Sequence, residues 1–137
     1  MKLAYVDSSA WITRIEGLEV YRKSINDCFN KLIYDGWLLC TSEVVSLEIL
    51  PKLYKENNDA IIDIYNNLFQ QTYTLKTFSN VFEQAMIIAQ TENLKAMDAI
   101  HVAIAVKNGC QCFVSTDKHF KNLKIISPIW IDLSTIK

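Results

Sequence analysis

The chain has 137 residues, of which 50% are hydrophobic and 21% are charged, and its formal net charge at pH 7 is −1. This length fits one domain with one core, and the apolar content is far from the composition of disordered chains, so residues 1–137 are expected to form a single globular domain. Only three glycines occur, which excludes both a Walker A loop and a glycine-rich dinucleotide-binding motif.

Neither a membrane segment nor a secretory segment is apparent in the sequence. The longest uninterrupted apolar runs are the five-residue segments 85–89 and 102–106, whereas a membrane-spanning helix needs about 20 residues. The first residues reach Asp7 without the apolar stretch of a signal peptide, so we expect a cytoplasmic protein that does not bind membranes. The four cysteines include no CxxC pair and are expected to be free, mostly buried thiols.

Short apolar segments alternate with segments of helical periodicity along the whole chain. In the first half, strands are predicted at residues 2–6 and 37–41, and helices from Ser8 or Ser9 through residue 15, at 20–35, and at 43–50, where Pro51 would end or kink the helix. In the second half, helices are predicted at 58–70, 80–93 and 96–108, a β-favouring segment at 72–78, a strand at 111–115, and one more edge strand from 124–126 and 130–133. The alternation indicates an α/β fold with a mostly parallel central sheet flanked by helices.

Two aspartates follow predicted strands directly. Asp7 comes after the first strand and is followed by Ser8 and Ser9, while Asp117 comes after the strand at 111–115 and is preceded by Thr116. Open parallel sheets bind ligands at the carboxyl ends of their strands, so both aspartates are candidate site residues. A single aspartate or hydroxyl in such a place is more often a helix cap or turn former, and this interpretation stays open.

Glu48 and Asp98 are two further carboxylates in apolar surroundings. Glu48 follows Val44 by one helical turn on a largely apolar face, and Asp98 stands in the first turn of the helix at 96–108. A buried carboxylate must be paired or must bind a metal ion, because an uncompensated charge in an apolar environment is costly. These two residues are therefore stronger candidates for a functional site than the strand-end aspartates alone.

Four short motifs, taken together and in order, resemble those of PIN-domain ribonucleases and are most similar to VapC-type toxins of bacterial toxin-antitoxin pairs. The motifs are Asp-Ser-Ser at 7–9, Ser-Leu-Glu-Ile at 46–49, Met-Asp-Ala-Ile-His-Val-Ala at 97–103 and Phe-Val-Ser-Thr-Asp at 113–117. The resemblance extends over nearly the whole chain and implies a PIN domain spanning residues 1–137.

The resemblance implies a divalent-metal-dependent endoribonuclease that hydrolyses RNA phosphodiester bonds. Its acidic quartet would be Asp7, Glu48, Asp98 and Asp117, which would bind one or two Mg²⁺ or Mn²⁺ ions, and Ser8, Thr116 and Lys118 would contact the substrate. Carboxylate oxygens are the ligands these ions prefer, and such ions activate water and neutralise phosphate charge. An antitoxin protein is the implied partner, and a homodimer is compatible with the resemblance. A non-catalytic PIN-like module that binds RNA or protein stays open as the alternative.

Three other titratable residues near the motifs are expected to lie outside the site. Glu43 precedes Glu48 by five residues, which places the two side chains about 140° apart around a helix. His101 continues the apolar stripe of its helix and His119 stands in a polar turn, so ordinary structural roles are expected for both.

Overall fold

The computed structural model describes residues 1–136, in which five strands form one all-parallel sheet with the order β3-β2-β1-β4-β5. The strands are β1 (Lys2–Val6), β2 (Trp37–Ser42), β3 (Tyr73–Leu75), β4 (Cys112–Ser115) and β5 (Ser127–Trp130). The helices are α1 (Ser8–Glu16), α2 (Glu19–Tyr34), α3 (Glu43–Lys55), α4 (Asp59–Gln70), α5 (Val81–Glu92) and α6 (Ala96–Lys107), and two 3₁₀ turns occupy Lys118–Phe120 and Leu133–Thr135. The predicted α/β class with a central parallel sheet is confirmed.

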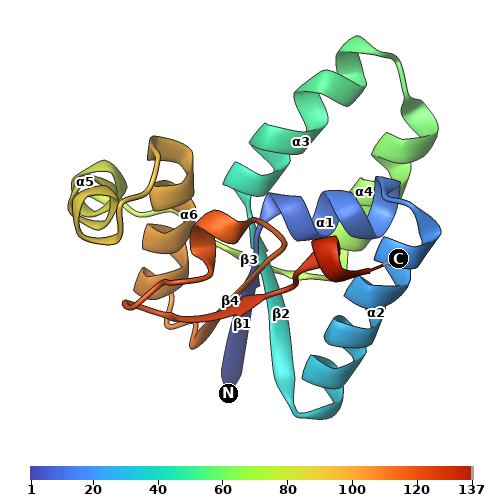
Figure 1. The fold of residues 1–137 in the computed structure, drawn as a ribbon. Helices are drawn as coiled ribbons and strands as arrows, with labels where there is room; N and C mark the ends of the chain where they lie inside the picture. The colour runs from blue at the N-terminus through green and yellow to red at the C-terminus, as the bar shows by residue number, and fades with distance from the viewer. Residues whose placement is uncertain (137) are drawn as a thin grey trace.

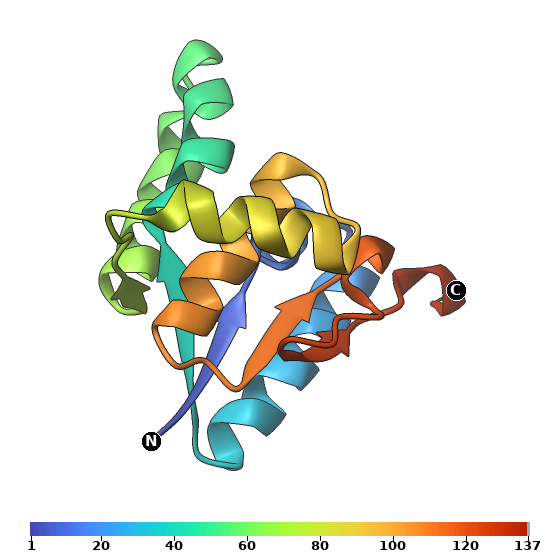
Figure 2. The ribbon, with the colours of Figure 1, turned by 90° about the vertical axis from the view of Figure 1, so that its left-hand side faces the viewer.

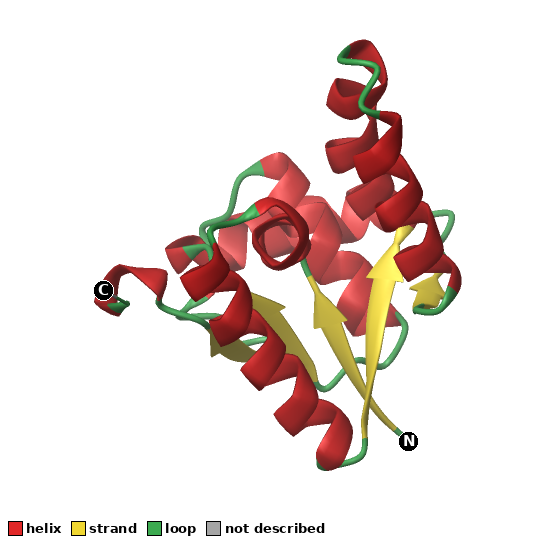
Figure 3. Ribbon diagram, turned by 90° about the vertical axis from the view of Figure 1, so that its right-hand side faces the viewer, coloured by secondary structure: helices red, strands yellow, loops and turns green. Residues whose placement is uncertain are grey.

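The sheet lies between two helical layers (Figure 1). Helices α5 and α6 cover one face, which Figure 2 presents to the viewer, and α1 and α2 cover the opposite face in Figure 3. Helix α3 extends beyond the carboxyl ends of the strands, and the chain returns along α4. Because both faces are covered, the central strands are largely apolar, and Ala4, Tyr5 and Val6 of β1 are fully buried.

The strand order reverses at β1. From β1 the chain adds β2 and then β3 on one side, and it later adds β4 and β5 on the other. The backbone N–H of Asp7 continues the pairing of β1 with β4 by donating to the carbonyl of Val114 at 3.0 Å. The carboxyl ends of β1 and β4 therefore flank the switch point at which open α/β sheets bind ligands.

The predicted cap of α1 and the predicted start of the edge strand were wrong, each for a local physical reason. The cap of α1 is Asp7 rather than Ser8 or Ser9, because the Asp7 carboxylate accepts from the backbone N–H of Ala10 at 3.2 Å. Residues 124–126 form no strand, because the N–H groups of Lys124 and Ile125 donate to the Glu92 carboxylate instead of a neighbouring strand. The edge strand is β5, which starts at Ser127.

Helix α3 runs through Pro51 rather than ending there. The buried side chains of Val45, Ile49 and Leu53 continue one apolar stripe across the proline. Packing of this stripe outweighs the lost hydrogen bond at Pro51, so the helix reaches Lys55.

All four cysteines are free, and Cys40, Cys110 and Cys112 are buried while Cys28 is half-buried, as predicted. Among residues 1–136, no helix combines the length and the hydropathy needed to cross a bilayer.

Replacement of Pro51 by alanine is expected to stabilise the protein. Alanine restores the backbone N–H that donates to the Leu47 carbonyl, and it removes the clash of the proline ring with that carbonyl. In helix interiors, alanine is more favourable than proline by up to about 3 kcal/mol of helix stability. Urea unfolding of Pro51→Ala should show a higher midpoint with an unchanged slope. A lower midpoint would mean that the proline ring itself contributes to the packing or rigidity of α3.

Candidate active site

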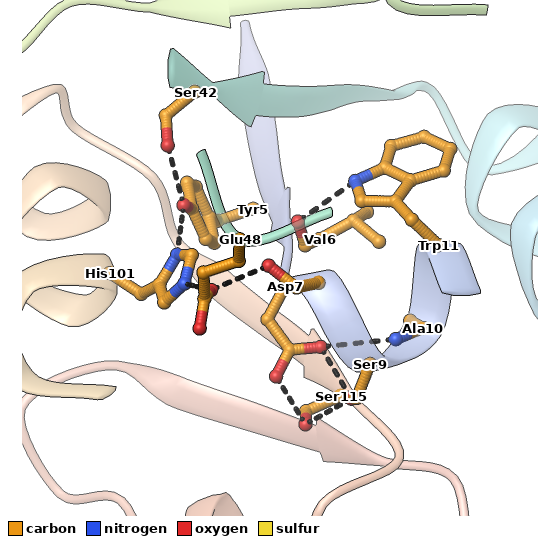
Figure 4. Close-up of polar contacts among 11 residues, drawn as sticks. Tyr5, Val6, Asp7, Ser9, Ala10, Trp11, Ser42, Glu48, His101 and Ser115 are labelled. Atoms are coloured by element: carbon orange, nitrogen blue, oxygen red, sulfur yellow. Dashed lines mark hydrogen bonds and ion pairs between the residues drawn. The ribbon is translucent and has the colours of Figure 1, made fainter. Parts of the chain in front are cut away.

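A group of polar and acidic side chains surrounds the carboxyl ends of β1 and β4. Asp7 stands at the end of β1, Glu48 on α3, Asp98 and His101 on α6, and Asp117 at the start of the 3₁₀ turn after β4. Residues from four segments that are distant in sequence thus meet at one edge of the sheet, and Figure 4 shows the contacts around Asp7, Glu48 and His101.

Asp7 is the most buried carboxylate of this group, with 4% of its surface exposed. Its Oδ1 accepts from Ser9 Oγ at 2.7 Å and from the backbone N–H of Ala10, and its Oδ2 accepts from Ser115 Oγ at 2.8 Å. Burial raises the pKa of Asp7 to about 6, although these three hydrogen bonds favour the ionised form. Asp7 therefore caps α1 and also presents a carboxylate whose charge is only partly compensated.

Glu48 is held by two partners from different elements. Its Oε1 accepts from Ser8 Oγ at 2.7 Å and pairs with His101 Nε2, while its side chain remains 31% exposed. The hydrogen bond from His101 is the main reason that the pKa of Glu48 is lowered. Glu48 is thus a partly exposed, ionised carboxylate with a fixed orientation.

Asp98, Asp117 and His119 form a second cluster beside these residues. Each offers one potential ligand atom, and the three atoms lie within 4.8 Å of one another. Asp117 Oδ1 accepts from the backbone N–H of His119 at 2.9 Å and lies 3.0 Å from His119 Nδ1. Burial raises the pKa of Asp98, and the negative charges of Asp117 and Glu48 raise it further.

The four predicted carboxylates are therefore neighbours but do not form one ligand cluster. Asp98 and Asp117 converge, together with His119, whereas Asp7 and Glu48 lie outside that group of three and are held by hydrogen bonds of their own. The effect of the Glu48 charge on Asp98 shows that the two parts of the site share one electrostatic environment.

The three predicted substrate contacts occupy different environments. Ser8 is buried and donates to Glu48, and Thr116 uses its backbone N–H to donate to Ser9 Oγ at 3.2 Å. Lys118 is exposed at the first position of the 3₁₀ turn beside Asp117. The hydroxyl that contacts Asp7 from β4 is that of Ser115 rather than that of Thr116.

Both histidines contact predicted site carboxylates, a position that the sequence analysis did not predict. His101 is buried and contacts Glu48, and His119 lies beside Asp117. The sequence carried a signal for His101, because it follows Asp98 by three residues and so shares a helix face with it. The role of Tyr5, which contacts His101, has no comparable signal within an apolar strand.

The donor set fits a hard divalent cation. Carboxylate oxygens dominate the site, as Mg²⁺ and Mn²⁺ require, and cysteine sulfur is absent from it in the part of the chain that the structure describes. The raised pKa values of Asp7 and Asp98 indicate negative charge that is not fully compensated by protein groups. A bound cation would supply that compensation.

Asp7→Asn is expected to stabilise the metal-free protein in a pH-dependent way. The pKa of Asp7 is about 6 in the folded state and about 4 in an unfolded chain, so its ionisation costs stability as the pH rises through this window. The variant should match the parent near pH 4 and exceed it above pH 6 by about 3 kcal/mol at most. Unfolding curves in EDTA across this range measure the difference.

Asp132→Asn is the control for this substitution. Asp132 also accepts a hydrogen bond from a backbone N–H two residues on, that of Ser134, but lies outside the acidic group. A stability gain of Asp7→Asn that is independent of pH would contradict the assignment of a raised pKa to Asp7.

The chain was compared with known proteins. A family model described as the PIN domain matches residues 4–126, and no curated protein matches the chain. Among solved structures, it is similar to VapBC2 from Rickettsia felis bound to a promoter DNA fragment, with 13% identity, a TM-score of 0.69, and coverage of 95% of this chain and 99% of that one.

Two further structures have the same degree of likeness. DNA-bound VapBC from Salmonella typhimurium has 14% identity, a TM-score of 0.70, and coverage of 94% of this chain and 98% of that one. VapC20 from Mycobacterium tuberculosis, described as a toxin that cleaves the sarcin-ricin loop, has 18% identity, a TM-score of 0.64, and coverage of 91% and 99%. At these identities the likeness concerns the fold.

Proposed function

The chain belongs to the PIN-domain family, and on this basis we propose that it is a divalent-metal-dependent endoribonuclease. The observation that carries the proposal is the convergence of Asp98 and Asp117 next to Glu48 at the switch point of the sheet. Burial and the negative charges of Asp117 and Glu48 raise the pKa of Asp98, and a structural role does not require three carboxylates in one place.

Asp7, Glu48, Asp98 and Asp117 are the proposed ligands of Mg²⁺ or Mn²⁺. The cation would lower the pKa of a bound water and neutralise phosphate charge. Ser9 and Ser115 orient the Asp7 carboxylate, while Ser8 and His101 orient that of Glu48. His119 lies at the exposed side of Asp117, where its ring can contact an approaching substrate.

The substrate is proposed to be RNA. Lys118, Lys121 and Lys124 follow Asp117 closely, and Lys121 lies over the ring of Trp130 at 5.4 Å. Basic residues beside an acidic metal site are suited to hold the phosphates that flank the cleaved bond. If four of the 15 acidic residues bind metal, the rest of the chain carries more basic than acidic residues, which suits a polyanionic substrate.

The biological role is proposed to be that of the toxin of a toxin-antitoxin pair, with a protein antitoxin as partner. The support is the likeness in fold to the VapBC complexes and to a VapC toxin over almost the full length of each chain. An antitoxin that covers the acidic residues would block access of RNA to them.

RNA cleavage that depends on added metal tests the proposed activity. The protein should cut RNA with Mn²⁺ or Mg²⁺ and not with EDTA, and either metal should raise the melting temperature by binding the folded state. Asp98→Asn should abolish most cleavage, yet melt in EDTA at or above the parental temperature, because it removes a carboxylate with a raised pKa.

Two results would count against this assignment. Cleavage that persists in EDTA would exclude the metal mechanism, and RNA or protein binding with no cleavage in either metal would favour the non-catalytic module. A strongly lowered melting temperature of Asp98→Asn would indicate a structural carboxylate.

Glu48 and Glu43 provide a matched pair on α3. Glu48→Gln should reduce cleavage by about 100-fold or more, because it removes a proposed ligand that also stabilises transition-state charge through the metal. Glu43→Gln should stay within about twofold of the parent, since Glu43 is exposed in the first turn of the helix. Rates measured under single-turnover conditions make the comparison, and equal losses would place Glu43 in the site.

A further inference from the structure

A continuous chain of hydrogen bonds leads from Ser42, the last residue of β2, to the Glu48 carboxylate (Figure 4). Ser42 Oγ lies 2.8 Å from the Tyr5 hydroxyl oxygen, which lies 2.5 Å from His101 Nδ1. On the other side of the ring, His101 Nε2 contacts Glu48 Oε1, which also accepts from Ser8. Ser42, Tyr5 and His101 are at most 2% exposed, so solvent does not compete for these bonds.

One assignment of donors and acceptors satisfies every group of this chain with a neutral ring. An ionised carboxylate only accepts hydrogen bonds, so His101 Nε2 carries a proton and donates to Glu48. A neutral imidazole protonated at Nε2 has an acceptor at Nδ1, which the Tyr5 hydroxyl can satisfy. The Tyr5 oxygen then accepts from Ser42, and all three buried side chains are satisfied without a buried cation.

The arrangement at Glu48 leaves one of its oxygens available. Ser8 and His101 both contact Oε1, and within residues 1–136 no donor reaches Oε2. Two donors on one oxygen hold the plane of the carboxylate, so the other oxygen has a defined direction. A carboxylate fixed in this way binds a cation with little further loss of side-chain entropy.

We propose that His101 is a positioning residue that orients Glu48 for metal binding, and that Tyr5 and Ser42 hold its ring in the Nε2–H tautomer. The proposal rests on the proposed function in that Glu48 is taken as a metal ligand. It adds to that function a set of buried residues, none of which touches metal or substrate, that determine how well the site binds its cation.

Tyr5→Phe is the central test, and Tyr65→Phe is its matched control. Tyr65 is also fully buried and its hydroxyl donates to a carboxylate, that of Glu16, at 2.5 Å, but the pair lies outside the acidic site. Tyr5→Phe should weaken Mn²⁺ binding about tenfold, the lower end of the usual loss for partners of metal ligands. Tyr65→Phe should bind Mn²⁺ as the parent does, and isothermal titration calorimetry measures both.

The tautomer of His101 gives a readout that is independent of metal and of cleavage. In metal-free protein at mildly alkaline pH, ¹⁵N–¹H correlation of the two histidine rings should show one ring with its proton on Nε2 and a hydrogen-bonded acceptor at Nδ1. A His119→Gln sample assigns that signal. In Tyr5→Phe, the ring of His101 should become a mixture of the two tautomers. Ser42→Ala should cause the same change to a smaller extent, and it disturbs the packing of the core less than Tyr5→Phe does.

The outcomes separate this inference from the proposed function. Titration of the unsubstituted protein comes first, and a failure to bind Mn²⁺ overturns the proposed function together with the positioning role. If the parent binds Mn²⁺, a ring of His101 that is protonated on Nδ1 or on both nitrogens overturns the inference alone. Parental Mn²⁺ affinity in both Tyr5→Phe and Ser42→Ala would do the same.

Discussion

The buried carboxylate of Asp7 joins the two strands on either side of the point where the strand order reverses. Its two oxygens accept from Ser9 and Ala10 in α1 and from Ser115 at the end of β4, and its backbone N–H continues the pairing of β1 with β4. One side chain therefore starts a helix, ties two strand ends together and contributes charge to the site. The incomplete compensation of that charge is the electrostatic constraint around which the other acidic residues are arranged.

The two remaining parts of the site depend on this frame in different ways. Glu48 reaches the switch point from α3 and is fixed by Ser8 of α1, so its position follows from that of the helix that Asp7 caps. Asp98 and Asp117 meet because α6 begins at the edge of the sheet where β4 ends. His101 lowers the pKa of Glu48, whereas burial and the charge of Asp117 raise the pKa of Asp98. Environments this different suit residues with different roles in one reaction.

Most strands and helices could be predicted from periodicity and composition, because the apolar strand segments and the amphipathic helix segments are the ones that the fold buries. The boundaries that were wrong depend on single tertiary contacts. The Glu92 carboxylate takes the N–H groups of residues 124 and 125, and the stripe through Leu53 carries α3 past Pro51. Spacing along the chain indicates which residues are candidates, but the contacts of His101 could not be predicted, because only the fold brings Tyr5 and Glu48 to its two ring nitrogens.

The contacts that build the site span most of the chain. Asp7 and Ser115 are 108 residues apart, Tyr5 and His101 are 96 apart, and Ser8 and Glu48 are 40 apart. Closing such long loops is slow, and parallel strands form only after their crossovers have been made. During synthesis, Asp7 lacks Ser115, the partner that orients it, until β4 has left the ribosome. The contacts that orient Asp7 therefore form only after β4 has been synthesised and has paired with β1, so a chain that stops before Ser115 lacks them.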